Sequence, residues 1–405
     1  MYLRAVIVVC VAFLSVMTAG ATIAQDSVRG RQRVALHVEE PADTTAPEHN
    51  IFKRIIAYFD DANKPKSNKR FDVSFIGGPH FSSDTKLGLG LVAAGNYRHD
   101  RSDTLTIPSN VSLYGDVSTV GFYLLGLRGT HLFPHDRYRI EYNLYFYSFP
   151  TNFWGIGYEM GKNDENKSKF KQFCFKGSVW GLKQFAPGLF AGVGAEYNRI
   201  EAHKVVNPEL WEGEAMRTNT TGLGVKIQYD TRDSHTEPYS GWLTSVEQKF
   251  CPGFLGNKYA FSFTAVRASH YRKVWKGGIL AGLVNGRFAY GDVPWGMLST
   301  FSSSSGMRGY YEGRYRDKCE VDLTLELRQH IWHRIGAVAW VGAGTVAPSL
   351  GEMRWRKVLP CVGVGYRWEF KKRCNVRLDF GIGRGETSFM FNINEAFYPQ
   401  KSFYC

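Results

Sequence analysis

The stretch Asp322-Leu323-Thr324-Leu325-Glu326-Leu327-Arg328 alternates polar and apolar residues. Successive side chains of a β-strand point to opposite faces of a sheet, so the leucines would share one face and the charged residues the other. Because an unpaired buried charge is very costly, the charged face needs either water or partners of opposite sign. The stretch predicts a strand with one apolar and one polar face.

A long polar loop precedes this strand. It begins at residues 299–305 and reaches Gly306-Met307-Arg308-Gly309-Tyr310, where one arginine stands among small residues. If Arg308 is buried it needs a carboxylate partner, and Glu326 is the nearest candidate downstream. We therefore expect the loop to place Arg308 beside the polar face of the strand.

The same alternation recurs in strand-length stretches from Phe71 onward, for example in residues 140–146, 223–230 and 377–382. A polar inside and an apolar outside is what a lipid bilayer demands of a closed sheet. The pattern predicts an all-β fold, a transmembrane antiparallel β-barrel of about 16 strands. The expected strands begin at Phe71, Lys86, Asn110, Gly121, Arg137, Ser168, Gly188, Thr220, Gly241, Lys258, Val274, Arg316, Arg334, Arg356, Cys374 and Thr387.

The connections between these strands favour the same architecture. Residues 150–167, 201–219 and 291–315 are long, whereas most alternate connections are short. Outer-membrane barrels have short periplasmic turns and longer extracellular loops, so the long connections are expected outside the cell. Residues 98–109 break this rule.

Composition agrees with a barrel and leaves one other class open. Aromatic residues make up 15% of the 405 residues, which is high for a soluble enzyme and typical of barrels with aromatic girdles. A large secreted all-β protein is the alternative. The net charge of +13 is scattered along the chain, which favours solvated loops, a polar interior and contact with lipid head groups over nucleic acid.

No cofactor, metal site or catalytic centre is expected. The cysteines show no CxxC spacing, so zinc is not expected, and their disulfide connectivity cannot be read from the sequence. The chain has no Gly-x-Ser-x-Gly motif, no His-Glu-x-x-His motif and no credible Ser/His pair. We therefore do not expect an enzyme.

Two segments are expected before the barrel. Residues 1–24 have a positive start at Arg4, an apolar core and small residues for cleavage, which is typical of a secretory signal peptide. Residues 25–70 form a polar linker in which residues 51–59 have apolar side chains at helical spacing. This short amphipathic helix would pack against the barrel or plug it, with membrane-surface contact as the alternative. The barrel is expected over 71–397 and a tail over 398–405.

Three stretches together resemble the BamA/TamA-type outer-membrane assembly-factor superfamily, which includes the bacterial surface antigen barrels. They cover nearly all of residues 71–397. The stretches are Gly306–Tyr310 with Glu326-Leu327-Arg328; Tyr229-Asp230-Thr231-Arg232-Asp233 with Pro238 and Gly241; and Gly363-Val364-Gly365-Tyr366-Arg367-Trp368 with Arg377-Leu378-Asp379-Phe380-Gly381 and the closing strand.

The resemblance implies a lid loop that folds back inside the barrel, with Arg308 paired to carboxylates of the lumen. Glu326 matches one family position. A second family acid is missing, since Trp340-Val341-Gly342-Ala343-Gly344-Thr345-Val346 stands there, and Asp379 is expected to replace it. Arg308 would either only anchor the loop or also gate the barrel. The family's periplasmic POTRA domain is not expected, because the linker is shorter than a domain.

The resemblance also implies a seam between the first and last strands. Gly77-Gly78-Pro79 would weaken pairing there, because proline lacks a donor and glycine weakens strands. A weak seam could open sideways and admit client strands by edge pairing, and a simple bend is the alternative. On the last strand, Phe389, Phe391, Ile393 and Phe397 would share one face, which resembles the terminal signal that assembly machinery reads.

The main functional hypothesis is an outer-membrane barrel that assists the insertion or translocation of outer-membrane or surface components. Its expected partners are outer-membrane lipid and lipopolysaccharide, unfolded barrel or surface-protein clients, and separate periplasmic proteins, but not nucleic acid. The alternative is a passive pore or structural barrel that acts with periplasmic partners.

Overall fold

The structure is a computed structural model that describes residues 71–82, 86–97, 109–235, 237–301, 306–371, 373–393 and 395–397. The expected signal peptide, the linker with its helix at 51–59, the connection at 98–108 and the tail lie outside the described residues. Within the described part of the chain, no helix is long and apolar enough to cross a membrane.

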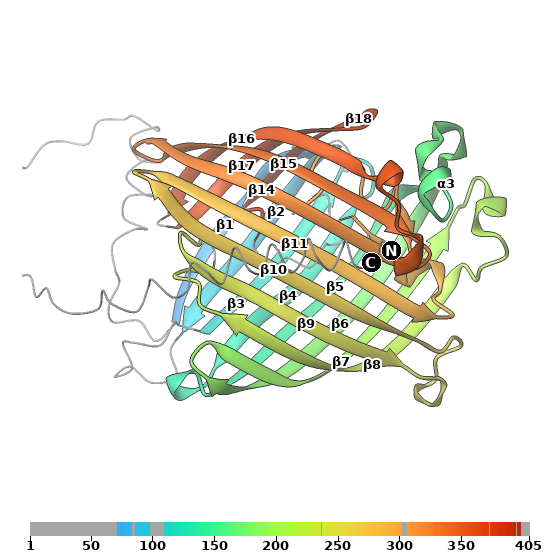
Figure 1. Cartoon of the computed structure of the whole chain (residues 1–405), viewed down its shortest axis with the longest axis horizontal. Coiled ribbons are helices and arrows are strands. Elements are labelled where there is room, and N and C mark those ends of the chain that lie inside the picture. The colour runs from blue at the N-terminus through green and yellow to red at the C-terminus, as the bar shows by residue number, and fades with distance from the viewer. Residues whose placement is uncertain are drawn as a thin grey trace, which may run out of the picture. The chain divides into compact units, whose positions relative to one another are not determined.

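One antiparallel sheet of 16 strands dominates the described residues (Figure 1). Each strand pairs with its neighbour in sequence, except that β12 and β13 form a separate two-stranded sheet between β11 and β14. The strands are β1 (Phe71–Ser82), β2 (Lys86–Tyr97), β3 (Ser109–Ser118), β4 (Tyr123–Leu132), β5 (Tyr138–Phe153), β6 (Ser168–Ala186), β7 (Leu189–His203), β8 (Arg217–Asp230), β9 (Gly241–Cys251), β10 (Phe261–Trp275), β11 (Gly278–Gly291), β12 (Ser299–Thr300), β13 (Arg316–Asp317), β14 (Cys319–Trp332), β15 (Ile335–Ala347), β16 (Leu359–Lys371), β17 (Cys374–Gly383) and β18 (Glu386–Ile393).

The predicted strand number is confirmed, and five predicted strand starts need correction. Thr220 lies inside β8, Lys258 precedes β10 by three residues, and Arg356 lies in the 3-10 turn η8 (Trp355–Lys357) before β16. Val274 lies near the end of β10, because the turn to β11 comes later, at Gly277 with its positive φ of 77°. Arg316 begins the short strand β13, and the barrel strand β14 starts only at Cys319. Alternation alone could not separate β13 from β14, because both have extended backbone.

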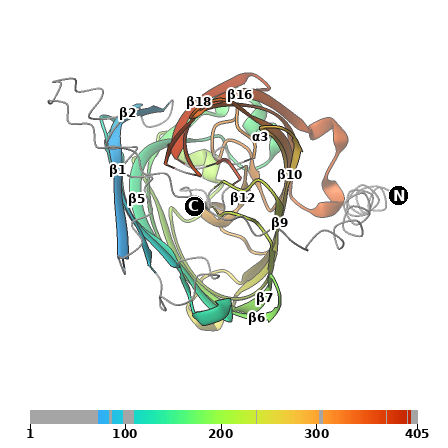
Figure 2. The same ribbon diagram turned by 90° about the vertical axis from the view of Figure 1, so that its left-hand side faces the viewer.

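The sheet curls into a barrel whose end strands are β1 and β18 (Figure 2). Its outer surface is apolar, as expected: Val193 is 65% exposed and Ile227 58% exposed, and leucines of β2, β3, β4 and β14 face outward as well. The inward residues of β8, such as Lys226 and Gln228, are buried. This is the pattern that lipid outside and polar groups inside require.

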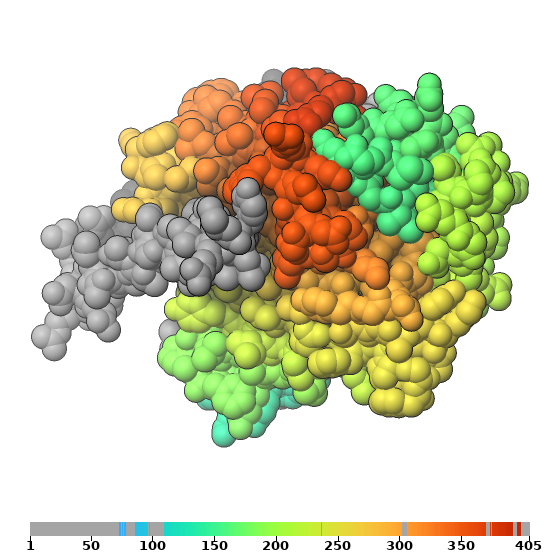
Figure 3. All heavy atoms as spheres, turned by 45° about the vertical axis from the view of Figure 1, so that its right-hand side comes forward, coloured from blue at the N-terminus to red at the C-terminus, as the bar shows by residue number. Residues whose placement is uncertain are grey.

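The two ends of the barrel differ in their connections. At the short-turn end, the connections that follow β4, β6, β10, β14 and β16 are brief, whereas the one that follows β8 runs over residues 231–240. At the long-loop end, the connections carry α3 (Tyr158–Lys162) and the 3-10 turns η3 (Asp164–Asn166), η4 (Pro208–Trp211), η5 (Gly253–Leu255), η6 (Trp295–Met297), η7 (Leu350–Glu352) and η8 (Trp355–Lys357). The connections after β5, β7, β9, β11 and β15 crowd this end in the space-filling view (Figure 3).

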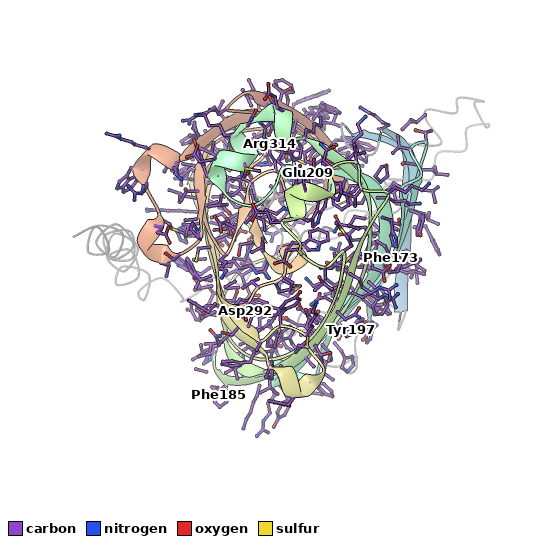
Figure 4. The ribbon with its side chains drawn as sticks, turned by 90° about the vertical axis from the view of Figure 1, so that its right-hand side faces the viewer. Phe173, Phe185, Tyr197, Glu209, Asp292 and Arg314 are labelled. Atoms are coloured by element: carbon purple, nitrogen blue, oxygen red, sulfur yellow. The ribbon has the colours of Figure 1, made fainter. Side chains whose placement is uncertain are left out.

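The expected polar interior is wrong for the long-loop half of the bore. An aromatic cluster lies there, with Trp211 and Trp295 packed on Phe153 and Phe170. Wall residues Tyr145, Tyr147 and Phe149 of β5 belong to the same cluster. The long connections fold over and into the mouth, as the positions of Glu209 and Arg314 show in Figure 4. Loops that cover the inner wall exclude water, so that part of the wall is apolar.

The expected course of the last strand also needs correction. Strand β18 ends at Ile393, and Phe397 does not share the outward face of Phe389 and Phe391. Phe397 is fully buried against Tyr271 of β10 and the inward residues Ala281 and Leu283 of β11. Tyr271 and Arg267 also donate hydrogen bonds to the Phe397 carbonyl oxygen. The chain therefore turns into the lumen after β18. Burying the Phe397 ring there, away from water, is favourable.

Candidate functional site

The connection from β11 to β14 forms a lid that reaches into the bore. At its tip Gly309 has φ of 136°, which L-side chains rarely adopt. A Cβ atom at Gly309 would also lie 2.8 Å from the carbonyl carbon of Ile382, and one at Gly381 would lie 2.4 Å from the Arg308 carbonyl oxygen. Glycine on both sides therefore lets the lid backbone lie directly against β17.

Arg308 is fully buried and holds two lumenal acids. It donates a hydrogen bond of 2.5 Å from Nη2 to Glu326 of β14 and one of 3.0 Å from Nη1 to Asp379 of β17. All three side chains are 0% exposed. The guanidinium also lies 3.7 Å from the ring centroid of Trp340, which occupies the family's missing-acid region. The residues that the sequence singled out thus come together in one buried cluster.

These residues belong to a closed ring of alternating charge. Arg328 lies 2.7 Å from Glu326, and both sit on the inward face of β14 because they are two residues apart. Arg328 and Arg367 lie 3.6 and 3.0 Å from Glu395. Arg367 also lies 2.6 Å from Asp379, which closes the circuit. We call the six residues the ion-pair ring: Arg308, Glu326, Arg328, Glu395, Arg367 and Asp379.

Sequence reasoning missed three members of the ring. Arg328 was expected on the polar face of its strand but not as a partner of Glu326, and Arg367 was noted only as part of a motif, although it also stands at an inward position that alternation could have identified. Glu395 gave no such signal, because it follows the last strand and its position depends on how the chain turns back. Arg377 adds a further cation 3.2 Å from Asp379. Each carboxylate in the ring therefore meets at least two guanidinium groups.

The lid also contacts the first residue of β18. The Glu386 carboxylate accepts a 3.0 Å hydrogen bond from the Tyr311 backbone nitrogen. It also forms an ion pair of 2.5 Å with Arg314. Next to it, Tyr310 is buried, donates a hydrogen bond of 2.6 Å to the Pro360 carbonyl oxygen and accepts one from the Arg384 nitrogen. Burial raises the pKa of Tyr310 to about 12. The lid thus touches the last strand at its start and, through the ring, the segment that follows its end.

The Asp230, Arg232 and Asp233 motif stabilises the turn between β8 and β9 at the short-turn end. Arg232 donates two hydrogen bonds of 2.9 Å to Asp230, and Asp233 accepts from the backbone nitrogens of Tyr239 and Ser240. This turn contacts the turn between β16 and β17, since Arg373 lies 3.0 Å from Asp233. The motif therefore has a structural role that is separate from the lid.

The seam residues are placed at the two ends of the sheet. Some Cα atoms of β1 and β18 lie within 8 Å of each other, yet the ladders described for these strands join β1 to β2 and β18 to β17. The pairing of β1 with β2 continues without a break through Gly77, Gly78 and the proline that follows. A Cβ atom at Gly77 would lie 2.7 Å from the Gly90 carbonyl oxygen, so close packing against β2 is one reason for glycine there.

No cluster suited to metal chemistry accompanies these features. In the described ranges, no group of three or more His, Cys, Asp or Glu side chains could hold a metal ion. The interactions of the lid residues are ion pairs and hydrogen bonds. Such interactions can stabilise one conformation of the lid, and breaking them can release it.

Comparison with known families decides the family of the chain. The Omp85 superfamily domain matches residues 63–397. The chain belongs to the Omp85 superfamily. Omp85 barrels are outer-membrane proteins, and the transmembrane antiparallel barrel described above has the fold of this superfamily. No curated protein matches the chain significantly.

Solved Omp85-like barrels share the fold at very low sequence identity. BamA from Haemophilus ducreyi lacking POTRA domains 1–3 has 11% identity and a TM-score of 0.50, covering 81% of this chain and 70% of that one. CdiB from Escherichia coli has 11% identity and a TM-score of 0.53, covering 80% and 59%. CdiB from Acinetobacter baumannii has 9% identity and a TM-score of 0.50, covering 80% and 60%. These values support the fold and not a shared activity.

Proposed function

We propose that this Omp85 barrel assists the insertion or translocation of outer-membrane or surface polypeptides, and that the lid holds its closed resting state. The observation that carries the proposal is the double attachment of the lid to the last strand. The lid binds Glu386 at the start of β18 directly, and Arg308 joins the ring that contains Glu395 beyond its end. Movement of the lid would therefore loosen both ends of the strand at the seam.

A client strand needs a free edge, and β18 is suited to offer one. Its described ladder joins it to β17 alone, so its other edge can accept backbone hydrogen bonds from an extended segment. In this reading Arg308 does more than anchor the loop, because its two acids are released together when the lid leaves. Separate periplasmic proteins would deliver the clients, and the outer membrane is the site of action.

The passive-pore alternative is less well supported by the interior. The aromatic cluster fills the long-loop half of the bore, and the lid crosses the space below it. A steady, wide conductance would require both to move. The charged cavity of the short-turn half, of about 350 Å³, is the remaining feature that a water-filled channel would use.

The structure offers a direct way to lock the lid. The sulfur of Met307 lies 3.9 Å from the thiol of Cys361 on β16, and Cys361 is a free cysteine. In the Met307→Cys variant, oxidation should join the lid to the wall and reduction should release it. The full chain is reconstituted in liposomes, and the rate at which an unfolded barrel substrate inserts is compared with the rate in empty liposomes.

The proposal expects acceleration by the wild-type chain, loss of acceleration in the oxidised Met307→Cys variant, and recovery on reduction. The matched control is Met307→Cys with Cys361→Ser, which cannot form the bond and should stay active under oxidant. No acceleration over empty liposomes by the wild-type chain contradicts the proposal. A large, steady conductance that oxidation leaves unchanged would favour the passive pore.

A further inference from the structure

The barrel wall has a low section beside the last strand. Strands β1 to β4 have 10–12 residues, whereas β5 to β7 have 15–19. Pairing with β4 stops at Ser148 of β5, so the last five residues of β5 continue above the neighbouring strand. The rim at the long-loop end therefore has a notch between β5 and β18, above the upper ends of β1 to β4.

A cavity of about 670 Å³ occupies this notch. Residues 150–152 of β5 line one side and residues 386–390 of β18 the other. Lys86 at the start of β2 and Val120 between β3 and β4 also line it, and the lid contributes Tyr310, Tyr311 and Arg314 from the inside. The cavity thus joins the outer surface of the barrel to the lid.

The charge of this cavity is strongly one-sided. Its lining contains the cations Lys86, Lys167, Lys169 and Arg314, and one carboxylate, Glu386, which is already engaged by Arg314. Within the part of the chain that the structure describes, the three lysine ammonium groups have no carboxylate within 4 Å, and all three lysines are exposed. The lining therefore carries an excess of positive charge that an anion could neutralise.

The position of the cavity indicates where the anion would come from. Below the notch, the outward residues are apolar: Leu125 of β4 is 53% exposed, and Phe389 and Phe391 of β18 are 37% and 39% exposed. The lysines thus stand at the upper border of the surface that faces the acyl chains, where the head groups of the outer leaflet lie. Lysine at this level attracts anionic lipid.

We infer that the notch binds the phosphorylated head group of a lipid in the outer leaflet, with Lys86, Lys167 and Lys169 as the phosphate-binding residues. Charge complementarity and continuity with the apolar surface favour a lipid over an acidic peptide. The bound phosphate would also lie beside Arg314 and compete with its two carboxylate partners, Glu386 and Asp164, which would connect lipid binding to the lid. The inference rests on the outer-membrane setting of the proposed function but not on the insertion activity.

The test uses the full chain in nanodiscs of phosphatidylcholine, with diphosphorylated lipid A titrated in and binding measured by native mass spectrometry. Lys167→Gln with Lys169→Gln should weaken binding roughly tenfold, since each lysine near an anionic surface contributes favourably. Lys167→Arg with Lys169→Arg should retain it. The matched control is Lys183→Gln with Lys276→Gln, which changes two exposed lysines at the short-turn end and should leave binding unchanged.

Removing the phosphates of lipid A should weaken its binding to the wild-type chain. The loss should match the loss that Lys167→Gln with Lys169→Gln causes for diphosphorylated lipid A. Equal binding of both lipids, or an equal loss in the control variant, would overturn the inference. Soluble pyrophosphate or an acidic peptide that binds as tightly as lipid A, with the same lysine dependence, would also overturn it, because the site would then serve a different ligand. Insertion activity is not part of any readout, so this test and that of the proposed function fail independently.

Discussion

In the long-loop half of the bore, Trp211 and Trp295 pack among phenylalanines, whereas in the short-turn half Arg308 and five partners form the ion-pair ring. Apolar packing is non-directional and tolerates small shifts. A buried ion pair requires partners at defined positions. Removing one of them leaves a buried charge without a partner, which is strongly destabilising. The difference suggests that the upper half seals the barrel while the lower half determines whether the lid stays in place.

The largest expected effect comes from reversing the charge at the centre of the ring. Arg308→Glu would place a third acid beside Glu326 and Asp379, so the free energy of unfolding should fall by at least about 3–5 kcal/mol. Adding Glu326→Arg should restore part of it. The measurement is the urea midpoint in detergent together with heat-modifiability on gels. Arg272→Ala, at an exposed position of β10, is the control, and equal midpoints for all variants would refute a buried pair.

The second effect concerns the aromatic half. Trp295→Ala removes a buried ring that contacts Phe153, Phe170 and Trp211, and should lower the free energy of unfolding by about 3–5 kcal/mol. It should also raise ion conductance in planar bilayers, because the seal is opened. Trp355→Ala, which changes a 66% exposed tryptophan in the same half, is the control. Unchanged conductance would mean that the lid alone closes the bore.

The third effect concerns whether changes in the free energy of unfolding add up, within the ion-pair ring and between the ring and the aromatic cluster. Arg308→Gln and Glu395→Gln change two ring members that communicate through Arg328 and Arg367, so their effects on unfolding should deviate from additivity by about 0.5–3 kcal/mol. Arg308→Gln and Trp295→Ala should add within about 0.5 kcal/mol, because the residues share no contact among those described. Urea unfolding of the two double-mutant cycles provides the comparison. Additivity in both cycles would show that the ring is not a unit.

The smallest effect is a pH dependence at the short-turn end. Burial, followed by the charge of Arg232, lowers the pKa of His235 to about 4, although Asp230 lies 3.6 Å away and acts in the opposite direction. The unfolded histidine binds a proton near pH 6.5, so stability is retained above that pH and decreases as pH falls toward 4. Between pH 7 and pH 5 the loss should be roughly 2 kcal/mol.

His235→Gln should flatten this pH dependence of the urea midpoint, while changes from other groups remain in both proteins. His330→Gln, at an exposed position near another turn, should keep the wild-type dependence. An unchanged slope in His235→Gln would show that the histidine is protonated in the folded barrel.

Much of the fold follows from the sequence, because lipid outside the barrel imposes one rule on every strand. The alternation of Leu323, Leu325 and Leu327 with Asp322, Thr324 and Glu326 was enough to assign faces, and sixteen repeats of such stretches gave the strand number. The same rule placed Glu326 and Asp379 on the inner side, whereas Arg308 was expected beside them from the cost of an unpaired buried charge and from the family resemblance. This rule does not apply to residues outside the barrel strands.

Only the tertiary structure decided what fills the bore. Phe397 has the same sequence pattern as Phe389 and Phe391, yet it turns into the lumen, and Glu395 enters the ring with it. The aromatic half depends likewise on loops that fold back over β5 and β6. Local sequence determines which face of a strand is apolar, since neighbouring side chains point in opposite directions. Which distant segment covers an inner face depends on packing between residues far apart in the chain, and alternation carries no record of it.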